Sequence, residues 1–324
     1  MPSRPIKLGV IMDPIGSINL KKDSTLAMLL EARQRGWELH YMEQTDLSLW
    51  QNQPWANTRK LTLSADPENA GDNGFSLAEV CTRPLAELDV VLMRKDPPFD
   101  MDYIFSTYLL ELAEAEGVLV VNRARSLRDA NEKLFTAYFP QCTAPMLVSA
   151  QAQGIRGFLA EHGDIILKPL DGMGGASIFR VQQDSPNIGV IIETLTRHGQ
   201  RLCMAQKFIP EINQGDKRIL LIDGEPVPYA LARIPQNGET RGNLAVGGIG
   251  KGIELNERDR WICQQVAPEL KKRGLIFVGL DVIGDYLTEI NVTSPTCIRE
   301  LDELYQLNIS ASLMDVIEQR LQNR

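Results

Sequence analysis

The chain has 324 residues, of which 44% are hydrophobic and 23% charged, a composition that is ordinary for a globular protein and gives room for two domains. Its formal net charge of −8 at pH 7 argues against a broad nucleic-acid-binding surface, which would need an excess of cations. The five cysteines show no paired spacing and there are only three histidines, which argues against a disulfide framework and against a zinc site.

The N-terminal residues run directly into a short apolar segment, without the long apolar core and cleavage site of a signal peptide. No apolar run reaches the roughly 18–20 residues that cross a bilayer. We therefore expect a cytoplasmic protein with reduced cysteines, and neither a membrane nor a nucleic acid as its partner.

The first third of the chain alternates short apolar runs with helical segments. Four apolar runs predict buried strands, at residues 6–12, 37–42, 88–93 and 118–121. Helices are expected between them, one capped by Asp23 or Ser24 and another over about 101–116. This alternation predicts an α/β domain over residues 1–125 with an open parallel sheet.

Two of these strands end in charged or polar loops, at residues 13–22 and 94–96. Open parallel sheets bind ligands beyond the carboxyl ends of their strands, so both loops are candidates for binding, although most loops are polar in any protein. Residues 44–84 are polar and poorly patterned, and we expect them at the periphery of the domain.

The second part of the chain, residues 126–324, predicts an α+β domain. Ser126 is expected to cap a helix over residues 127–139. After Pro145 the pattern predicts a strand, a helix and a second strand at 164–170, and β-hairpin signals dominate the rest.

A glycine-rich turn at residues 172–175 follows the strand that carries Lys168. Glycines let backbone amides approach phosphate oxygens closely, and Lys168 would neutralise the same phosphates. The pattern is neither a Walker A loop nor a dinucleotide-binding fingerprint. A plain hairpin turn remains the alternative, because Asp-Gly is a strong turn signal.

The segment 278–291 predicts a hairpin with a Gly-Asp turn. A two-residue loop would pair Asp281 with Thr288, whereas a three-residue loop would pair it with Glu289; we predict the second, because a glycine makes that loop sterically easy. Asp281, Glu289 and Asn291 would then offer three oxygen ligands on one face, which suits Mg²⁺ completed by substrate phosphates. A polar outer face is the alternative, but the strands are otherwise apolar, and carboxylates in apolar settings need partners.

Four arginines flank these hairpins: Arg218, Arg233, Arg241 and Arg299. Each alone is typical of a surface charge, but arginine binds phosphate and carboxylate oxygens bidentately, and together they predict a site for several anions. The segment 236–252 contains six glycines. It predicts a lid that closes over a nucleotide, with a mobile surface loop as the alternative.

Six motifs in chain order resemble the pattern of bacterial glutathione synthetase, over residues 6 to about 318. They are MDP at 12–14, MRKDPPFD at 93–100, NEK at 131–133, KPLDGMGG at 168–175, GNL at 242–244 and TEINVTSPT at 288–296. The resemblance implies that an ATP-grasp fold follows the N-terminal domain. It implies a central subdomain at about 145–210, a lid at about 235–252 and a C-terminal subdomain that carries the hairpin.

The resemblance also implies roles for individual residues. The residues expected to bind ATP are Lys133, Lys168, Gly172, Gly174, Gly175, Ser177, Gln206, Lys207, Phe208, Ile209, Asp216 and Asn291. The expected ligands of Mg²⁺, or of Mn²⁺, are Asp281, Glu289 and Asn291. The expected catalytic residues are Arg218, Arg233, Arg241 and Arg299. The residues expected at the other substrates are Asp13, Arg94, Asp96, Arg233, Gly242, Ser294 and Thr296.

The function that the resemblance implies is the ATP-dependent joining of γ-glutamylcysteine and glycine. An acyl phosphate would be the intermediate, and glutathione, ADP and phosphate the products, in a homo-oligomer that is a tetramer by resemblance. Other ATP-grasp ligases, of the D-alanine–D-alanine or peptide–glutamate type, are alternatives. A nucleotide-binding scaffold without catalysis is a remote one, because the expected metal ligands and Arg241 are all present.

Overall fold

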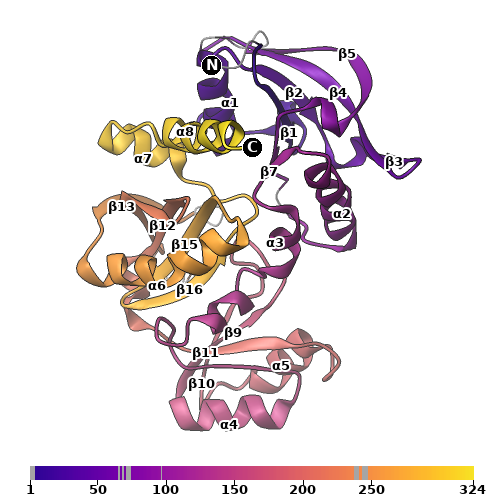
Figure 1. Cartoon of the computed structure of the whole chain (residues 1–324). Coiled ribbons are helices and arrows are strands. Elements are labelled where there is room, and N and C mark those ends of the chain that lie inside the picture. Colours follow the sequence, from indigo (N-terminus) through magenta and orange to yellow (C-terminus); the bar gives the residue numbers. More distant parts are fainter. Residues whose placement is uncertain are drawn as a thin grey trace.

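The computed structural model describes residues 4–64, 66–67, 69–70, 74–95, 97–236, 241–242 and 247–324. Three layers follow one another down the molecule in Figure 1: an N-terminal sheet, a C-terminal subdomain and a central subdomain. An α/β sheet thus precedes an α+β region, in agreement with the predicted fold class.

The N-terminal sheet has seven strands. They are β1 (Lys7–Ile11), β2 (Glu38–Met42), β3 (Leu47–Trp50), β4 (Gln53–Leu63), β5 (Phe75–Pro84), β6 (Val90–Met93) and β7 (Leu119–Val121). The four predicted strands β2, β1, β6 and β7 are parallel neighbours. However, β4 joins β2 in the antiparallel sense and pairs with both β3 and β5, so the sheet is mixed rather than wholly parallel.

The described residues of the segment 44–84 lie at the edge of this sheet, and the hairpins that they form were not predicted. The burial pattern of β4 is consistent with these hairpins. Ala56, Thr58, Leu61 and Leu63 are buried, and the residues between them are more exposed. Such alternation is typical of an antiparallel strand with one covered face.

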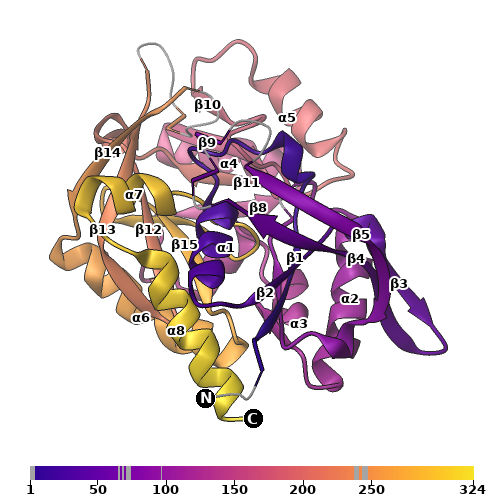
Figure 2. The ribbon, with the colours of Figure 1, turned by 90° about the horizontal axis from the view of Figure 1, so that it is seen from above.

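Helices cover both faces of the N-terminal sheet. On one face lie α1 (Ser24–Gln34), α7 (Ile298–Tyr305) and α8 (Ile309–Gln322), packed on the buried side chains of Leu8 and Val10. On the other lie α2 (Met101–Ala115) and α3 (Ala124–Asp129), packed on Met93 and Val120. The chain thus returns from its C-terminal part to complete the N-terminal layer, and α8 runs beside α1 in Figure 2.

The remaining elements form two antiparallel sheets with helices. The central subdomain contains β8 (Met146–Ser149), α4 (Ala152–His162), β9 (Asp164–Pro169), β10 (Phe179–Gln182), α5 (Ile188–Thr196) and β11 (Cys203–Lys207). The C-terminal subdomain contains β12 (Asp216–Ile222), β13 (Glu225–Ile234), β14 (Ile249–Glu254), α6 (Glu257–Arg273), β15 (Phe277–Ile283) and β16 (Tyr286–Asn291). Short 3₁₀ turns are η1 (Ile15–Ser17), η2 (Gln44–Asp46), η4 (Leu85–Glu87), η5 (Leu134–Tyr138) and η6 (Pro210–Gln214).

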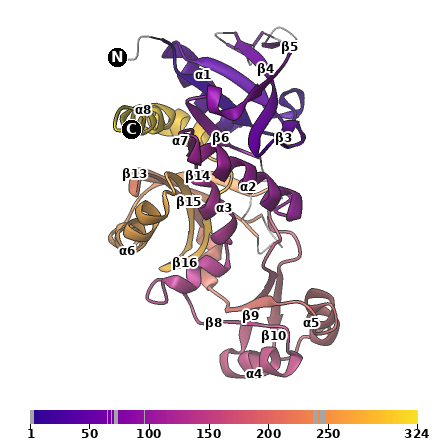
Figure 3. The same ribbon diagram turned by 45° about the vertical axis from the view of Figure 1, so that its right-hand side comes forward.

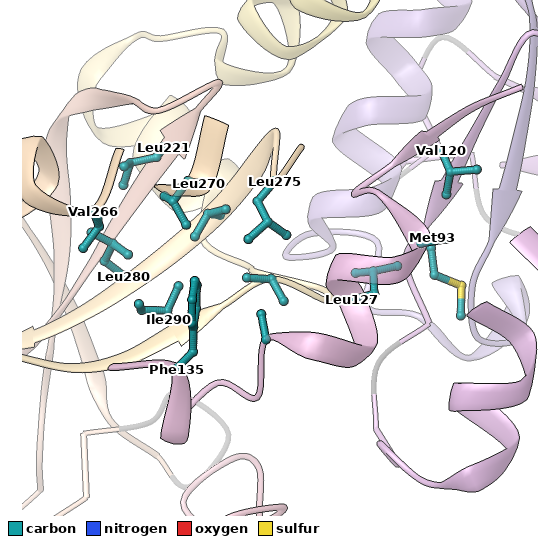
Figure 4. Packing of buried hydrophobic residues seen from close by; sticks show 14 of the residues in the cluster. Met93, Val120, Leu127, Phe135, Leu221, Val266, Leu270, Leu275, Leu280 and Ile290 are labelled. Carbon is teal, nitrogen blue, oxygen red and sulfur yellow. The ribbon is translucent and has the colours of Figure 1, made fainter. Parts of the chain in front are cut away.

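One hydrophobic core is shared by the N-terminal layer and the C-terminal subdomain. One cluster runs from Met93 and Val120 in the N-terminal layer to Leu280 and Ile290 in the C-terminal subdomain (Figure 4). The central subdomain has its own core, around Ile155, Leu167 and Ala205, and stands apart from the other layers in Figure 3.

The buried side chain of Asn122 links the two layers that share a core, the N-terminal sheet and the C-terminal subdomain. It is buried, and its Nδ2 donates hydrogen bonds of 2.7 Å to the carbonyl oxygens of both Phe277 and Val292. Its Oδ1 accepts bonds from the backbone N–H groups of Ile276, at 2.7 Å, and Phe277, at 2.8 Å. One side chain therefore holds the end of β7 against the start of β15 and the end of β16.

The helix predicted over residues 127–139 is wrong in its extent. α3 begins earlier and ends at Asp129, and only the short turn η5 follows. The physical reason is Asn131, whose Oδ1 accepts the backbone N–H groups of Lys133 (3.2 Å) and Leu134 (2.9 Å) in a local turn that competes with the helix. Ser126 does not cap this helix, because its hydroxyl donates to the carbonyl of Arg273 at 2.6 Å.

Among the helices of the described ranges, none is both long and apolar enough to cross a membrane.

Candidate active site

The predicted pairing of Asp281 with Glu289 is confirmed, but the predicted three-residue loop is wrong. A two-residue turn pairs Ile283 with Tyr286, and a β-bulge then inserts Thr288, so that Glu289 lies opposite Asp281. The Thr288 hydroxyl donates to the Asp281 carbonyl at 3.0 Å. Both carboxylates therefore project from the same face of the hairpin, as a metal site requires.

Asp281 is held by two arginines from neighbouring strands. Arg218 of β12 lies directly across from it and donates from Nε at 2.5 Å and from Nη2 at 3.0 Å. Nη2 of Arg233 on β13 lies 2.9 Å from the same carboxylate. Burial alone would raise the pKa of Asp281, but the two guanidinium groups outweigh it and hold that pKa well below its usual range.

Lys133 and Lys168 converge on Glu289. Nζ of Lys133 contacts the Glu132 carboxylate, donates to the carbonyl of Gly172 at 2.5 Å and lies 3.5 Å from Glu289. Nζ of Lys168 lies 3.8 Å from the same carboxylate. Burial lowers the pKa of Lys168, whereas for Lys133 burial is outweighed by Glu289 and Glu132, which raise its pKa. Two buried ammonium groups from different segments thus face one acidic hairpin.

The glycine turn between β9 and β10 lies against the same group of charges. Gly174 and Gly175 have φ angles of +64° and +82°, which favour glycine, and a Cβ on Gly172 would lie 2.6 Å from the ring of Pro169. Arg241 donates from Nη1 to the Gly175 carbonyl at 3.2 Å, so the segment predicted as a lid meets the turn.

The rest of the predicted lid is only partly described. Residues 237–240 and 243–246 lie outside the described residues. Residues 249–252 belong to β14, paired with β13, so the C-terminal end of the predicted lid is a strand. Gly242 approaches the Arg233 carbonyl so closely that a Cβ would collide with it.

A narrow cleft runs between the central sheet and the C-terminal subdomain. It is lined by Lys133, Lys168, Gly172, Gly174, Gly175, Gln206, Lys207, Phe208, Ile209, Asp216, Arg241, Gly242 and Glu289, together with Ile166, Ile178, Ile212 and Ile283. Alternation along β11 turns Ala205 into the central core and Gln206 toward the cleft. Most of the residues predicted to bind nucleotide therefore share one cleft. Ser177, which is exposed, and Asn291, which is buried, are not among its lining residues.

Two buried polar atoms in this cleft have no hydrogen-bond partner among the described residues: Nε2 of Gln206 and Oδ1 of Asp216. The side chain of Asp216 also pairs with Arg233. Burial raises the pKa of Asp216 to about 7 against the pull of Arg233, and the charges of Asp281 and Glu289 add to the rise. Buried polar groups without partners are costly, so both atoms suit a ligand that supplies them.

The predicted substrate residues fall in different places. Arg94 is buried and donates to the Pro295 carbonyl at 2.9 Å, while Ser294 donates to the Arg94 carbonyl at 3.2 Å. Asp13 pairs with Lys95 at 2.6 Å in a separate hollow. Thr296 is exposed, and Asp96 lies outside the described residues.

The predicted catalytic arginines do not share one place: Arg241 lines the cleft. Arg218 and Arg233 contact Asp281, and Arg299 lies elsewhere. It lines a separate hollow beside α1, near Glu31 and Asp302. A larger hollow of about 1230 Å³, near Arg4 and Asp89, contains none of the predicted site residues.

Comparison with known proteins identifies the family. Residues 6–128 match the prokaryotic glutathione synthetase N-terminal domain, and residues 132–306 match the ATP-grasp domain of the same enzymes. The chain is 62% identical over 318 residues to a protein named glutathione synthetase from Vibrio vulnificus (strain CMCP6), covering 98% of this chain and 99% of that one. The chain belongs to the prokaryotic glutathione synthetase family.

Further comparisons agree with this family. Glutathione synthetase from Yersinia pestis is 61% identical over 320 residues, covering 98% and 99% of the two chains. Among solved structures, D-cycloserine synthetase DcsG aligns with a TM-score of 0.67 at 14% identity, over 97% of this chain and 99% of that one. The ATP-grasp ligase PsnB with minimal precursor, Mg and ADP aligns with a TM-score of 0.61 at 16% identity, over 98% of each chain. The predicted ATP-grasp fold and the predicted class, an ATP-dependent ligase of glutathione synthesis, are confirmed.

Sequence reasoning missed Glu132 and the apolar lining of the cleft in this family member. Glu132 belongs to the Asn-Glu-Lys motif, but the predicted helix gave it no place at the site. In the structure the Ile290 N–H donates to its carbonyl at 2.8 Å, which holds it beside β16. Burial and the charge of Glu289 raise the pKa of Glu132 to about 7, with Lys133 opposing.

Replacing Glu132 by Gln is expected to change how stability depends on pH. Because its pKa is about 7 rather than the ordinary 4.5, native Glu132 keeps a proton that the unfolded chain releases in this window, so the free energy of unfolding falls as pH rises from about 4.5 to 7. Urea unfolding at pH 5 and at pH 8 measures the free energy of unfolding of wild type and of E132Q. Relative to wild type, the variant should gain on the order of 1–3 kcal/mol of stability between pH 5 and pH 8. The exposed Glu161→Gln is the control, and parallel pH profiles for wild type and E132Q would contradict the assignment.

Replacing Gln206 by Met is expected to raise the KM for ATP by about tenfold with little change in kcat. The variant keeps the shape of the side chain but removes the buried amide that faces the cleft without a partner. Steady-state kinetics with ATP and GTP measure the effect, and Gln151→Met, exposed in the same subdomain, is the matched control. An unchanged KM would show that this amide does not contact the nucleotide.

Proposed function

We propose that this protein joins γ-glutamylcysteine to glycine through an acyl phosphate, with release of ADP and phosphate, at the cleft described above. The observation that carries the proposal is the convergence of Lys133 and Lys168 on Glu289 beside the glycine turn. Cations, backbone amides and a carboxylate hairpin are the groups that a transferring phosphoryl needs.

The donor set of the hairpin fits a divalent cation. Asp281 and Glu289 face each other across the strands, and Asn291 follows two residues later, opposite Gly279. Three oxygen donors on one face suit Mg²⁺ or Mn²⁺, which keep positions open for phosphate oxygens. We propose these residues as the ligands; when bound, the cation would neutralise charge on the transferring phosphoryl.

The rest of the chemistry follows from what surrounds this hairpin. A carboxylate carbon is a poor electrophile, so the γ-phosphoryl group of ATP is first transferred to a carboxylate oxygen of γ-glutamylcysteine and ADP is released. The amine of glycine then attacks the carbonyl carbon, loses a proton and displaces phosphate. Lys133 and Lys168 hold the phosphates, and Arg218 and Arg233 balance the negative charge gathered at Asp281.

Water must be kept from the acyl phosphate, because hydrolysis would waste ATP. Arg241 reaches the Gly175 carbonyl, so we propose that its segment closes over the glycine turn when nucleotide is bound. For the other substrates we propose the end of β6 and the segment after β16, which Arg94 and Ser294 link. Asp13, Asp96, Gly242 and Thr296 remain proposals for the same role, as does Arg299 for catalysis.

We further propose that the enzyme acts in the cytoplasm as a homotetramer on these small molecules, without a nucleic acid or membrane partner. This rests on the resemblance of the sequence to its family. Light scattering on the purified chain measures the subunit number directly.

The decisive measurement of activity is ADP release from ATP. We expect release that requires γ-glutamylcysteine and glycine together, with glutathione formed in equal amount. Release with D-alanine alone would favour a D-alanine–D-alanine type of ligase. Nucleotide binding without turnover under any combination of substrates would favour the scaffold.

A further inference from the structure

A small hollow adjoins the cleft: its lining residues Glu132, Asp171 and Met173 are chain neighbours of residues that line the cleft. Its volume is about 20 Å³, and its apolar walls come from Phe99, Ala130, Leu170, Met173 and Val292. These residues belong to four separate segments: the loop after β6, the turn after α3, the glycine turn and the end of β16. A space of this size holds a group of one or two heavy atoms.

The polar residues at the rim of this hollow already have partners. Asn131 donates to the Leu170 carbonyl at 2.9 Å, and Thr293 donates to Asn291 at 3.4 Å. Glu132 pairs with Lys133, and Asp171 with Arg201. The surface offered to a ligand is therefore mainly that of the five apolar side chains.

The place of the hollow relates it to the reaction. Three rim residues connect the hollow to the groups proposed to bind the phosphates and the cation. Glu132 and Asp171 precede Lys133 and Gly172 in the chain, and Thr293 donates a hydrogen bond to Asn291. On the proposed function, the carboxylate that accepts the phosphoryl lies close to these same groups. In γ-glutamylcysteine, the side chain next to that carboxylate is –CH₂–SH.

We propose that this hollow receives the cysteinyl side chain of the dipeptide substrate and selects a small, weakly polar group over a hydroxyl. The inference rests on the proposed function. A thiol gives up little on leaving water and makes soft contacts with the thioether of Met173. A hydroxyl loses its hydrogen bonds to water among apolar walls. Because Met173 belongs to the glycine turn, the turn that covers the phosphates also forms one wall for this side chain.

Four dipeptides test the proposal, with ATP and glycine held constant: γ-glutamyl-cysteine, -2-aminobutyrate, -serine and -glycine. We expect kcat/KM for the aminobutyrate compound within about fivefold of the cysteine compound, because a methyl group has about the size of a thiol. We expect the serine compound to be about 10- to 100-fold poorer. Met173→Ala should lower kcat/KM about tenfold for the cysteine and aminobutyrate compounds and little for the glycine compound.

A second variant, Ala130→Val, fills the hollow instead of opening it, and should also act more strongly on the cysteine compound than on the glycine compound. Met101→Ala, exposed on α2, is the matched control. Equal use of the serine and cysteine compounds, or an equal effect of both variants on all four dipeptides, overturns the proposal. If wild type forms no glutathione, the proposed activity fails; calorimetric binding of the same dipeptides to wild type and Met173→Ala then still decides the role of the hollow.

Discussion

Replacing Glu289 by Gln is expected to lower kcat by on the order of 10³-fold while the protein stays folded. Glu289 lies across the hairpin from Asp281, and both lysine ammonium groups of the cleft lie within 3.8 Å of it. The amide keeps the shape and size of the side chain but removes the charge that faces those lysines and that the proposed divalent cation would need. By transition-state arithmetic the loss amounts to about 4 kcal/mol.

ADP release at increasing Mg²⁺ concentration measures this loss, with circular dichroism as the check on folding. Asp285→Asn is the matched control, because it makes the same chemical change at the exposed turn of the same hairpin and should leave kcat within about twofold. Wild-type rates for E289Q at ordinary Mg²⁺ would remove Glu289 from the proposed ligands.

Replacing Asn122 by Ala is expected to lower the free energy of unfolding by about 3–5 kcal/mol. Four buried backbone groups lose their partner at once, since this amide bonds to two carbonyls and two N–H groups near β15 and β16. The cost is large because Asn122 is buried in a core that two layers share, where backbone groups without partners are expensive.

Urea unfolding at pH 7 measures the change for N122A. Asn57→Ala is the control, because Asn57 is exposed and its side chain accepts a hydrogen bond from Thr82 at the surface, so that the change should cost less than about 0.5 kcal/mol. A loss below about 1 kcal/mol for N122A would show that the two layers are held together by apolar packing alone.

The hairpin shows what the sequence predicts well and what it does not. Its apolar residues and its turn predicted two strands, and the requirement that buried carboxylates have partners predicted that Asp281 and Glu289 share a face. The loop length was wrong because the same pairing arises from a shorter turn and a bulge at Thr288. That bulge is supported by the bond from the Thr288 hydroxyl to the Asp281 carbonyl, which no local pattern reveals.

The helix predicted over residues 127–139 was wrong for a different reason. Its residues favour a helix, but Asn131 forms a local turn, and the Ile290 N–H binds the Glu132 carbonyl from a strand more than 150 positions away. A contact of that range overrides propensity and cannot be read from neighbours along the chain. The place of Arg299 could not be read from the sequence either: α7 puts it in a hollow beside α1, and its catalytic role stays a prediction.

The separate core of the central subdomain has a mechanical consequence. The apolar cluster around Ile155, Leu167 and Ala205 is closed on itself, and only residues 143–145 and 208–215 carry the chain between this layer and the next. Rotation about those two connections would widen the cleft between the layers while leaving the core of the central subdomain intact. Such a hinge motion is the expected route for product to leave the cleft.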